Sequence, residues 1–233
     1  MKMVPAIHVK SNRMNFYVII PAHNEAAHIG AVLERARKLV APERIIVVDD
    51  GSRDNTSQEA KEKGVTVLRQ VINIGKGSAL RTGSIYACRK GAEVLIYMDS
   101  DGQHDPEDLP RILAAFSGND IVFTYRAVRS ANMPLVKKFG NAFIDVLTKL
   151  LFHINITDTQ SGYKAMTRAA YEKMKLISND YSIESEIVAK TGKYQLKFTQ
   201  VPIKTVYADR YKGTTVFDGI NIVMKMLWWK IAR

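Results

Sequence analysis

The chain has 233 residues, of which 46% are hydrophobic and 24% are charged, and this is the usage of an ordinary globular protein. The composition excludes a disordered, collagen-like or coiled-coil chain, and the length favours one domain over residues 1–233. No apolar run approaches the roughly 18 residues that span a bilayer, and we expect no secretory signal in the first 14 residues. The lone cysteine, Cys88, excludes an internal disulfide framework and fits a reducing compartment.

The net charge is +11, because 34 basic residues face 23 acidic ones, and a chain of this kind favours anionic partners. Nucleic acid, phosphorylated substrates and an acidic membrane face all qualify. Residues 121–144 contain no acid but hold Arg126, Arg129, Lys137 and Lys138, which form either a phosphate pocket or a solvated face. Basic and aromatic residues do not interleave on a predicted strand or helix, so we expect no nucleic acid partner.

Strands and helices alternate along the chain. The first strand is predicted at residues 16–20, and Asn24 is expected to cap a helix whose apolar positions extend to Leu39. Further strands are predicted at residues 45–48, 65–68, 94–98, 121–125 and 196–203. Further helices are predicted at residues 54–63 and 75–90, from Asp105 onward, and at residues 135–150, 183–190 and 217–231.

This alternation of apolar strands and helices predicts an α/β fold with one mostly parallel sheet covered on both faces. Binding sites in such sheets lie beyond the carboxyl ends of the strands. Three polar clusters fall there, at residues 21–25, 49–52 and 99–103. We therefore expect them to share one site.

The cluster Asp99-Ser100-Asp101-Gly102-Gln103 carries the chemistry most suited to a metal ion. Mg²⁺ binds through one or two carboxylates together with substrate phosphates, and Gln103 adds another oxygen ligand. The alternative is a plain Asp- and Gly-rich turn, which is common. The other two clusters at the same edge favour the metal site.

Two further segments allow more than one interpretation. Asp49 and Asp50 end a buried strand, and burying their charges costs free energy unless they bind a partner. The alternative is that they form an ordinary turn. Residues 73–77, which contain Lys76, lack the P-loop pattern, and the dinucleotide fingerprint needs glycine where Leu80 stands. The apolar stripe of residues 217–231, flanked by tryptophans and basic residues, fits either ordinary packing or a helix in a membrane interface.

Taken together, the segments 21–25 (Pro-Ala-His-Asn-Glu), 47–56 and 99–103 resemble the family 2 glycosyltransferases of GT-A fold. The resemblance covers a core of about residues 16–206, and residues 207–233 would form a loop and a C-terminal amphipathic helix. Within the family, residues 157–164 look like the branch of dolichyl-phosphate mannose and glucose synthases, which make polyprenyl-phosphate sugars.

The resemblance implies roles for individual residues. The nucleotide and donor would be bound by Pro21, Ala22, Asn24, Glu25, Asp50, Asn73, Lys76, Gly77, Asp99 and Ser100. Mg²⁺ or Mn²⁺ would be held by Asp99, Asp101 and Gln103. The acceptor phosphate would be met by Arg126, Lys137, Lys138, Gln160, Ser161, Arg210 and Lys212. Asp101, Arg126 and Asp158 would be catalytic, and a lysine stands where the family often has a second arginine.

The implied reaction is the inverting, metal-dependent transfer of a sugar from a nucleotide-sugar to a polyprenyl phosphate at the cytoplasmic face of the membrane. The motifs favour UDP-glucose or UDP-N-acetylglucosamine over GDP-mannose. One alternative is a sugar hydroxyl acceptor, which would need Asp158 as a base. A second alternative is a non-catalytic protein that binds the membrane surface.

Overall fold

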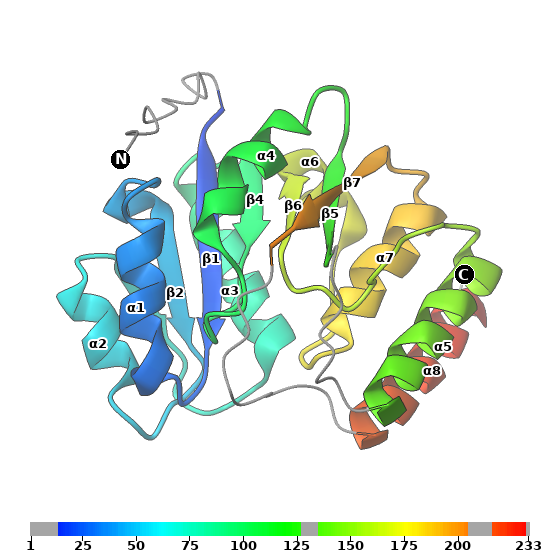
Figure 1. The fold of residues 1–233 in the computed structure, drawn as a ribbon, viewed down its shortest axis with the longest axis horizontal. Helices are drawn as coiled ribbons and strands as arrows, with labels where there is room; N and C mark the ends of the chain where they lie inside the picture. Colours follow the sequence, from blue (N-terminus) through cyan, green and yellow to red (C-terminus); the bar gives the residue numbers. More distant parts are fainter. Residues whose placement is uncertain (1–13, 127–134, 205–215, 232–233) are drawn as a thin grey trace, which may run out of the picture.

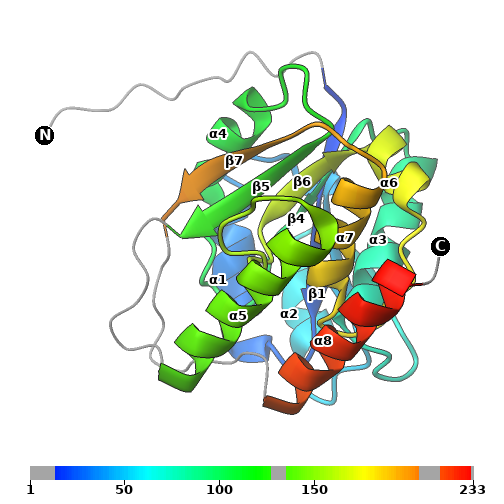
Figure 2. The ribbon, with the colours of Figure 1, turned by 90° about the vertical axis from the view of Figure 1, so that its right-hand side faces the viewer.

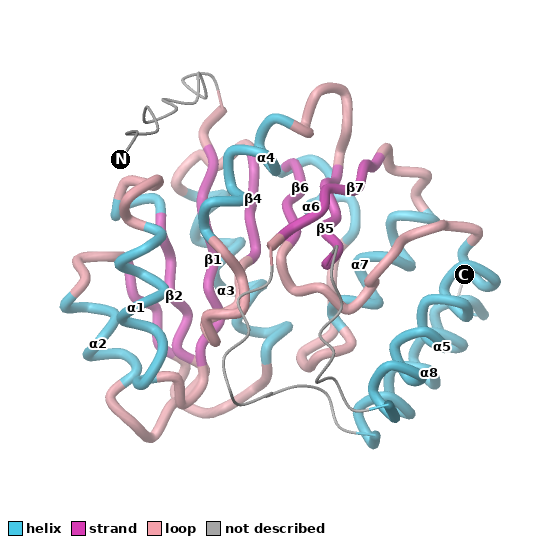
Figure 3. The backbone as a smooth tube through the Cα atoms, in the orientation of Figure 1, coloured by secondary structure: helices cyan, strands magenta, loops and turns pink. Residues whose placement is uncertain are grey.

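The computed structural model describes residues 14–126, 135–204 and 216–231, and within the two helices at 135–152 and 216–231 some side chains are left out. Seven strands form one sheet in the order β3-β2-β1-β4-β6-β5-β7 (Figures 1 and 3). The strands are β1 Phe16–Ala22, β2 Ile45–Asp49, β3 Thr66–Arg69, β4 Val94–Tyr97, β5 Ile121–Arg126, β6 Lys164–Thr167 and β7 Phe198–Ile203.

Most strand pairs are parallel, as the sequence predicts. β1 pairs in parallel with β2 and β4, β2 with β3, and β5 with β7. The exception is β6, which lies antiparallel between β4 and β5 and was missing from the predicted elements. It is only four residues long and begins with a lysine, so the sequence shows no apolar run there.

Eight α-helices and two short 3₁₀ turns are found among the described residues. The helices are α1 Ala26–Ala36, α2 Thr56–Glu62, α3 Lys76–Arg89, α4 Leu109–Ala114, α5 Leu135–Phe152, α6 Arg168–Met174, α7 Ile183–Lys193 and α8 Val216–Ile231, and the 3₁₀ turns are Pro42–Arg44 and Pro106–Asp108. The helix expected from Asp105 onward is thus a 3₁₀ turn followed by α4, and α6 was not predicted.

The sheet separates two apolar cores, because successive strand residues point to opposite faces. On β1, Val18 and Ile20 join α1 and α4 on one face, whereas Ile19 joins α3, α6 and α7 on the other. Figure 1 shows α1 and α4 in front of the sheet and α3 and α6 behind it. The covered faces explain why these strands read as continuous apolar runs.

The cap of α1 differs from the prediction. Glu25 stands at the N-cap and makes no side-chain capping bond, while Asn24 has a backbone φ of 54°. The side-chain oxygen of Asn24 instead accepts a hydrogen bond of 2.9 Å from the backbone N–H of Arg53. The Ala26 N–H in the first turn donates to Asp54 at 3.1 Å. Asp54, in the loop after β2, therefore accepts the hydrogen bond that was expected to go to Asn24.

Helices α5 and α8 lie side by side at one end of the molecule (Figure 2), with Ile144, Ile222 and Met226 buried between them. Among the described residues, no helix is both long and apolar enough to cross a bilayer.

The close packing of α3 on the sheet gives a stability prediction. A Cβ atom at Gly83 would lie 2.5 Å from Ile19 Cγ2 and 3.0 Å from Val48 Cγ2. We expect Gly83→Ala to lower the free energy of unfolding by about 1–3 kcal/mol in urea titrations, because overpacking outweighs the gain in helix propensity.

The matched control is Gly140→Ala on α5, where a Cβ would meet no described atom within 4 Å. Here only helix propensity acts, and we expect stabilisation of about 0.5–1 kcal/mol. Equal effects of the two substitutions would contradict the close packing of α3.

Candidate active site

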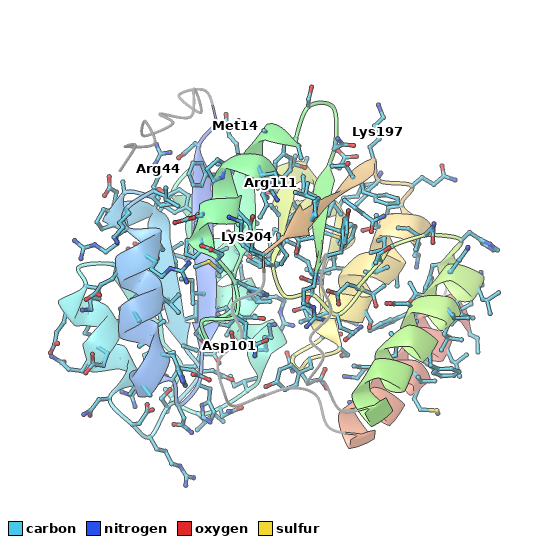
Figure 4. All side chains as sticks on the ribbon, viewed as in Figure 1. Met14, Arg44, Asp101, Arg111, Lys197 and Lys204 are labelled. Carbon is cyan, nitrogen blue, oxygen red and sulfur yellow. The ribbon has the colours of Figure 1, made fainter. Side chains whose placement is uncertain are left out.

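A cleft of about 820 Å³ opens at the carboxyl ends of β1, β2, β4 and β5. Its walls come from the segments after these strands, the start of α3, residues 160–162 and the segment that leads into α7. Asp101 lies at this end of the sheet, opposite the end marked by Met14 and Lys197 (Figure 4). The three polar clusters of the sequence therefore meet in one place.

Most of the expected site residues line this cleft. They are Pro21, Ala22, Asn24, Glu25, Asp50, Asn73, Lys76, Asp99, Ser100, Asp101, Gln103, Arg126, Gln160 and Ser161.

Six expected residues are not among the described residues that line the cleft. Gly77 packs against the Ser178 carbonyl, where a Cβ would come within 2.2 Å, so its close backbone approach is to protein. Asp158 lies behind Arg126, as described below. Lys137 and Lys138 are on α5, but their side chains are not among those described, and Arg210 and Lys212 lie outside the described residues.

Asp50 fixes the loop of residues 73–75 at the edge of the cleft. Its two carboxylate oxygens accept hydrogen bonds of 2.8 Å from the backbone N–H groups of Ile74 and Gly75. The neighbouring Asp49 is fully buried and accepts from Ser52 N at 2.8 Å and from the Ser57 hydroxyl. Of the two adjacent acids, only Asp50 faces the cleft, and Asp49 has a structural role.

Asp99 forms an ion pair with a lysine at the floor of the cleft. Lys76 Nζ lies 2.7 Å from Asp99 Oδ1, and burial would raise the pKa of Asp99, yet the charge of Lys76 holds it at about 2. Asp99 also packs closely against Gly162, since a Cβ there would lie 2.2 Å from its Oδ2. A larger residue than glycine at position 162 would displace this carboxylate.

Asp101 has a different environment. The backbone N–H of Gln103 donates to its Oδ1 at 2.9 Å, and no cationic side chain of the described residues pairs with it. Burial and the negative charge of Asp99 raise the pKa of Asp101 above its ordinary value. A bound cation would relieve this repulsion.

The residues present fit a hard divalent cation. Two carboxylates and the amide of Gln103 lie in one cleft, and such ions accept oxygen ligands. The described residues hold no cluster of three or more His, Cys, Asp or Glu side chains able to enclose a metal. The cation would therefore complete its coordination with water and substrate, as Mg²⁺ commonly does.

Arg126 and Asp158 form a bidentate pair. Arg126 Nε donates to Asp158 Oδ2 at 2.7 Å and Nη2 donates to Oδ1 at 2.6 Å, while the backbone N–H of Arg126 also reaches Oδ2 at 3.2 Å. The Asp158 side chain is only 5% exposed. Both of its oxygens are thus engaged by one guanidinium.

Sequence reasoning missed several residues of the site. Glu184 lies at the start of α7 and lines the cleft together with Tyr181 and His104. Lys164 on β6 is 1% exposed and pairs with Glu184. A buried lysine needs a buried acid as its partner, but the sequence shows neither that these side chains are buried nor which charges pair.

Comparisons with known proteins identify the family of this chain. The sequence model of the family described as glycosyl transferase family 2 matches residues 17–175. A relative from Methanococcus voltae, named UDP-N-acetylglucosamine–dolichyl-phosphate N-acetylglucosaminyltransferase, is 31% identical over 93% of this chain and 96% of its own length. A relative from Micrococcus luteus, named undecaprenyl-phosphate mannosyltransferase, is 30% identical over 94% of this chain and 95% of its own.

A solved structure shows the same fold. Glucosyl-3-phosphoglycerate synthase from Mycobacterium tuberculosis, in complex with Mn²⁺, UDP and glucosyl-3-phosphoglycerate, superposes with a TM-score of 0.70 at 20% identity. The match covers 94% of this chain and 80% of that one. The expected GT-A fold is thereby confirmed, and together with the family match it shows that this chain belongs to glycosyltransferase family 2 and is a sugar-transferring enzyme.

Proposed function

We propose that this enzyme transfers a sugar from a nucleoside diphosphate sugar to a polyprenyl phosphate, with inversion at the sugar C1. The names of the relatives from Methanococcus voltae and Micrococcus luteus both specify a polyprenyl phosphate acceptor. The acceptor phosphate would attack C1, the bond from C1 to the diphosphate oxygen would break, and the nucleoside diphosphate would leave.

The observation that carries this choice of acceptor is the pair between Arg126 and Asp158. A sugar hydroxyl acceptor needs a general base, and Asp158 was the candidate. Its carboxylate is buried and both oxygens receive N–H groups of Arg126, so it is poorly placed to take a proton. A phosphate monoester with a second pKa of about 6 is already ionised at neutral pH and needs no base.

Arg126 then serves as the cation at the acceptor end of the cleft. Asp158 holds the guanidinium in a fixed orientation, and Arg126 lines the cleft beside Gln160 and Ser161. A fixed arginine favours an anionic acceptor, because little conformational entropy is lost when the phosphate binds. The ion pair therefore supports binding of a phosphate.

At the donor end, the chain would bind the diphosphate close to Asp101 and Gln103. A divalent cation held there would offset the negative charge that grows on the departing diphosphate. Lys76 lies at the floor of the cleft, where its ammonium group is paired with Asp99 and Glu184. We favour a UDP-sugar over GDP-mannose, from the motifs at residues 73–77 and 101–103 and from the donor named for the Methanococcus voltae relative.

We also propose that the enzyme docks on an anionic bilayer through α5 and α8. Their outer surfaces expose Phe143, Val146, Leu150, Met224, Leu227, Trp228 and Ile231. The exposed Lys149 and Lys230 flank these apolar positions and complement anionic headgroups. A polyprenyl phosphate lies in the bilayer, so the enzyme has to bind it at the membrane surface.

The direct test of the function is a panel of UDP- and GDP-sugars, each with Mn²⁺ or Mg²⁺ and with or without polyprenyl phosphate. We expect one UDP-sugar to give a glycosylated lipid, and excess chelator to abolish the product. Transfer to a sugar hydroxyl in place of the lipid would contradict the proposed acceptor.

The acceptor role of Arg126 is tested with Arg126→Lys, which keeps the positive charge but removes the planar guanidinium and its paired N–H donors. We expect the KM for polyprenyl phosphate to rise about tenfold, with the Kd for UDP unchanged within about twofold. Arg111→Lys is the matched control, since Arg111 is half exposed and lies outside the cleft. Equal loss of nucleotide and acceptor binding would refute the assignment.

The membrane contact is tested by cosedimentation with vesicles of anionic lipid. We expect the double variant Trp228→Ser, Ile231→Ser to bind about tenfold more weakly, because two exposed apolar side chains no longer enter the interface. Val71→Ser, at a residue that is 98% exposed beyond β3, is the control and should bind like the wild type. Unchanged binding of the double variant would exclude α8 from the contact.

A further inference from the structure

A chain of alternating charges runs from the floor of the cleft into the interior. Lys76 Nζ is 2.7 Å from Asp99 Oδ1 and 2.9 Å from Glu184 Oε1, and the other oxygen of Glu184 pairs with Lys164. The chain joins the start of α3, the turn after β4, the start of α7 and the start of β6. None of the roles assigned to the site residues so far explains why Lys76 has two carboxylate partners.

The surroundings hold this lysine in place. Glu184 is 3% exposed and Lys164 is 1% exposed, so Glu184 is itself anchored by a fully buried charge. Asp99 packs against Gly162 on one side while its side chain stays 25% exposed, and its backbone N–H donates to His104 Nδ1 at 3.0 Å. Glu184 is thus fixed by Lys164, and the ion pair at 2.7 Å keeps the ammonium group beside Asp99.

The two carboxylates of the Asp99-Ser100-Asp101 motif are consequently unequal. Asp99 already has a cation at 2.7 Å, whereas Asp101 has only the Gln103 N–H at 2.9 Å among the described residues. The carboxylates of Asp99, Asp101 and Glu184, set against the ammonium groups of Lys76 and Lys164, leave these five side chains one net negative charge. A single net charge attracts a divalent cation weakly when competing water is at hand.

We propose that Lys76 makes binding of the divalent cation depend on the donor diphosphate, with Asp101 as the carboxylate that takes the cation and Asp99 retained by Lys76. This inference rests on the proposed use of a nucleoside diphosphate donor. The diphosphate supplies the negative oxygens that Asp99 cannot give while it is paired. Glu184 acts through Lys76, as a positioning residue that keeps the ammonium on Asp99.

The coupling has a functional consequence. Two unpaired carboxylates would hold a cation in the empty cleft and leave it there after the nucleotide departs. With Lys76 in place, the cation and the nucleoside diphosphate would bind and dissociate together, since each would supply charge that the other needs. Reciprocity follows from linkage: the cation strengthens UDP binding by the same factor as UDP strengthens cation binding.

The test is a titration with Mn²⁺, in which free Mn²⁺ is followed by electron paramagnetic resonance with and without saturating UDP. For the wild type we expect UDP to tighten Mn²⁺ binding by about tenfold or more. For Lys76→Met we expect Mn²⁺ affinity without UDP to rise about tenfold, because a charge beside Asp99 is removed, and the effect of UDP to shrink. Lys63→Met, at a lysine paired with Glu34 outside the cleft, controls for the change in net charge.

A second comparison does not depend on the folding of Lys76→Met. With UDP present, Asp99→Asn should bind Mn²⁺ within about threefold of the wild type, whereas Asp101→Asn should lose at least about tenfold. Circular dichroism and metal-free UDP binding report the fold of each variant.

The outcomes separate two claims. Equal loss of Mn²⁺ in Asp99→Asn and Asp101→Asn, or a folded Lys76→Met that binds Mn²⁺ no more tightly than the wild type, would overturn the role of Lys76 and leave the glycosyltransferase function standing. Absence of Mn²⁺ binding by the wild type even with UDP would refute the metal-dependent function itself, and the coupling with it.

Discussion

The site depends on the burial of opposite charges beneath the cleft. Lys76 lies between Asp99 and Glu184, and Glu184 is held from behind by Lys164. Removing charges from water costs several kcal/mol for each ion, so such a cluster persists only when every charge has a partner. The pairing joins four elements that are distant in the chain, and it thereby fixes the turn that carries Asp101 against the rest of the cleft.

At the acceptor end of the cleft, a single ion pair holds the cationic side chain in place. Arg126 ends β5 and Asp158 belongs to the segment before β6, and their bidentate contact sets the orientation of the guanidinium. Each end of the cleft thus contains a cationic side chain whose position is determined by carboxylates, and at the donor end a divalent cation would add the positive charge that Lys76 shares with Asp99 and Glu184. Two anions, the donor diphosphate and the acceptor phosphate, repel each other strongly in a cleft of low dielectric unless fixed positive charge lies close to both.

The sequence predicted the polar clusters of the site better than the contacts within it. Residues 21–25, 49–52 and 99–103 were expected to meet because parallel strands end at one edge, and the structure brings them into one cleft. Asn24 was expected to cap α1, and Asp54 bonds the first turn instead. Glu184 and Tyr181 were not predicted, because neither has a motif or a spacing that marks it.

By itself the sequence determined the alternation of strands and helices, the parallel strands with both faces covered, and the family, because apolar periodicity and short motifs are local properties of the chain. Only the tertiary structure decided that β6 enters the sheet antiparallel, that Asp99 and not Asp101 has a lysine partner, and that Arg126 engages Asp158. The physical reason is that ion pairing between residues 23 to 108 positions apart depends on how the chain folds back in space, and no local sequence pattern shows which charges will pair.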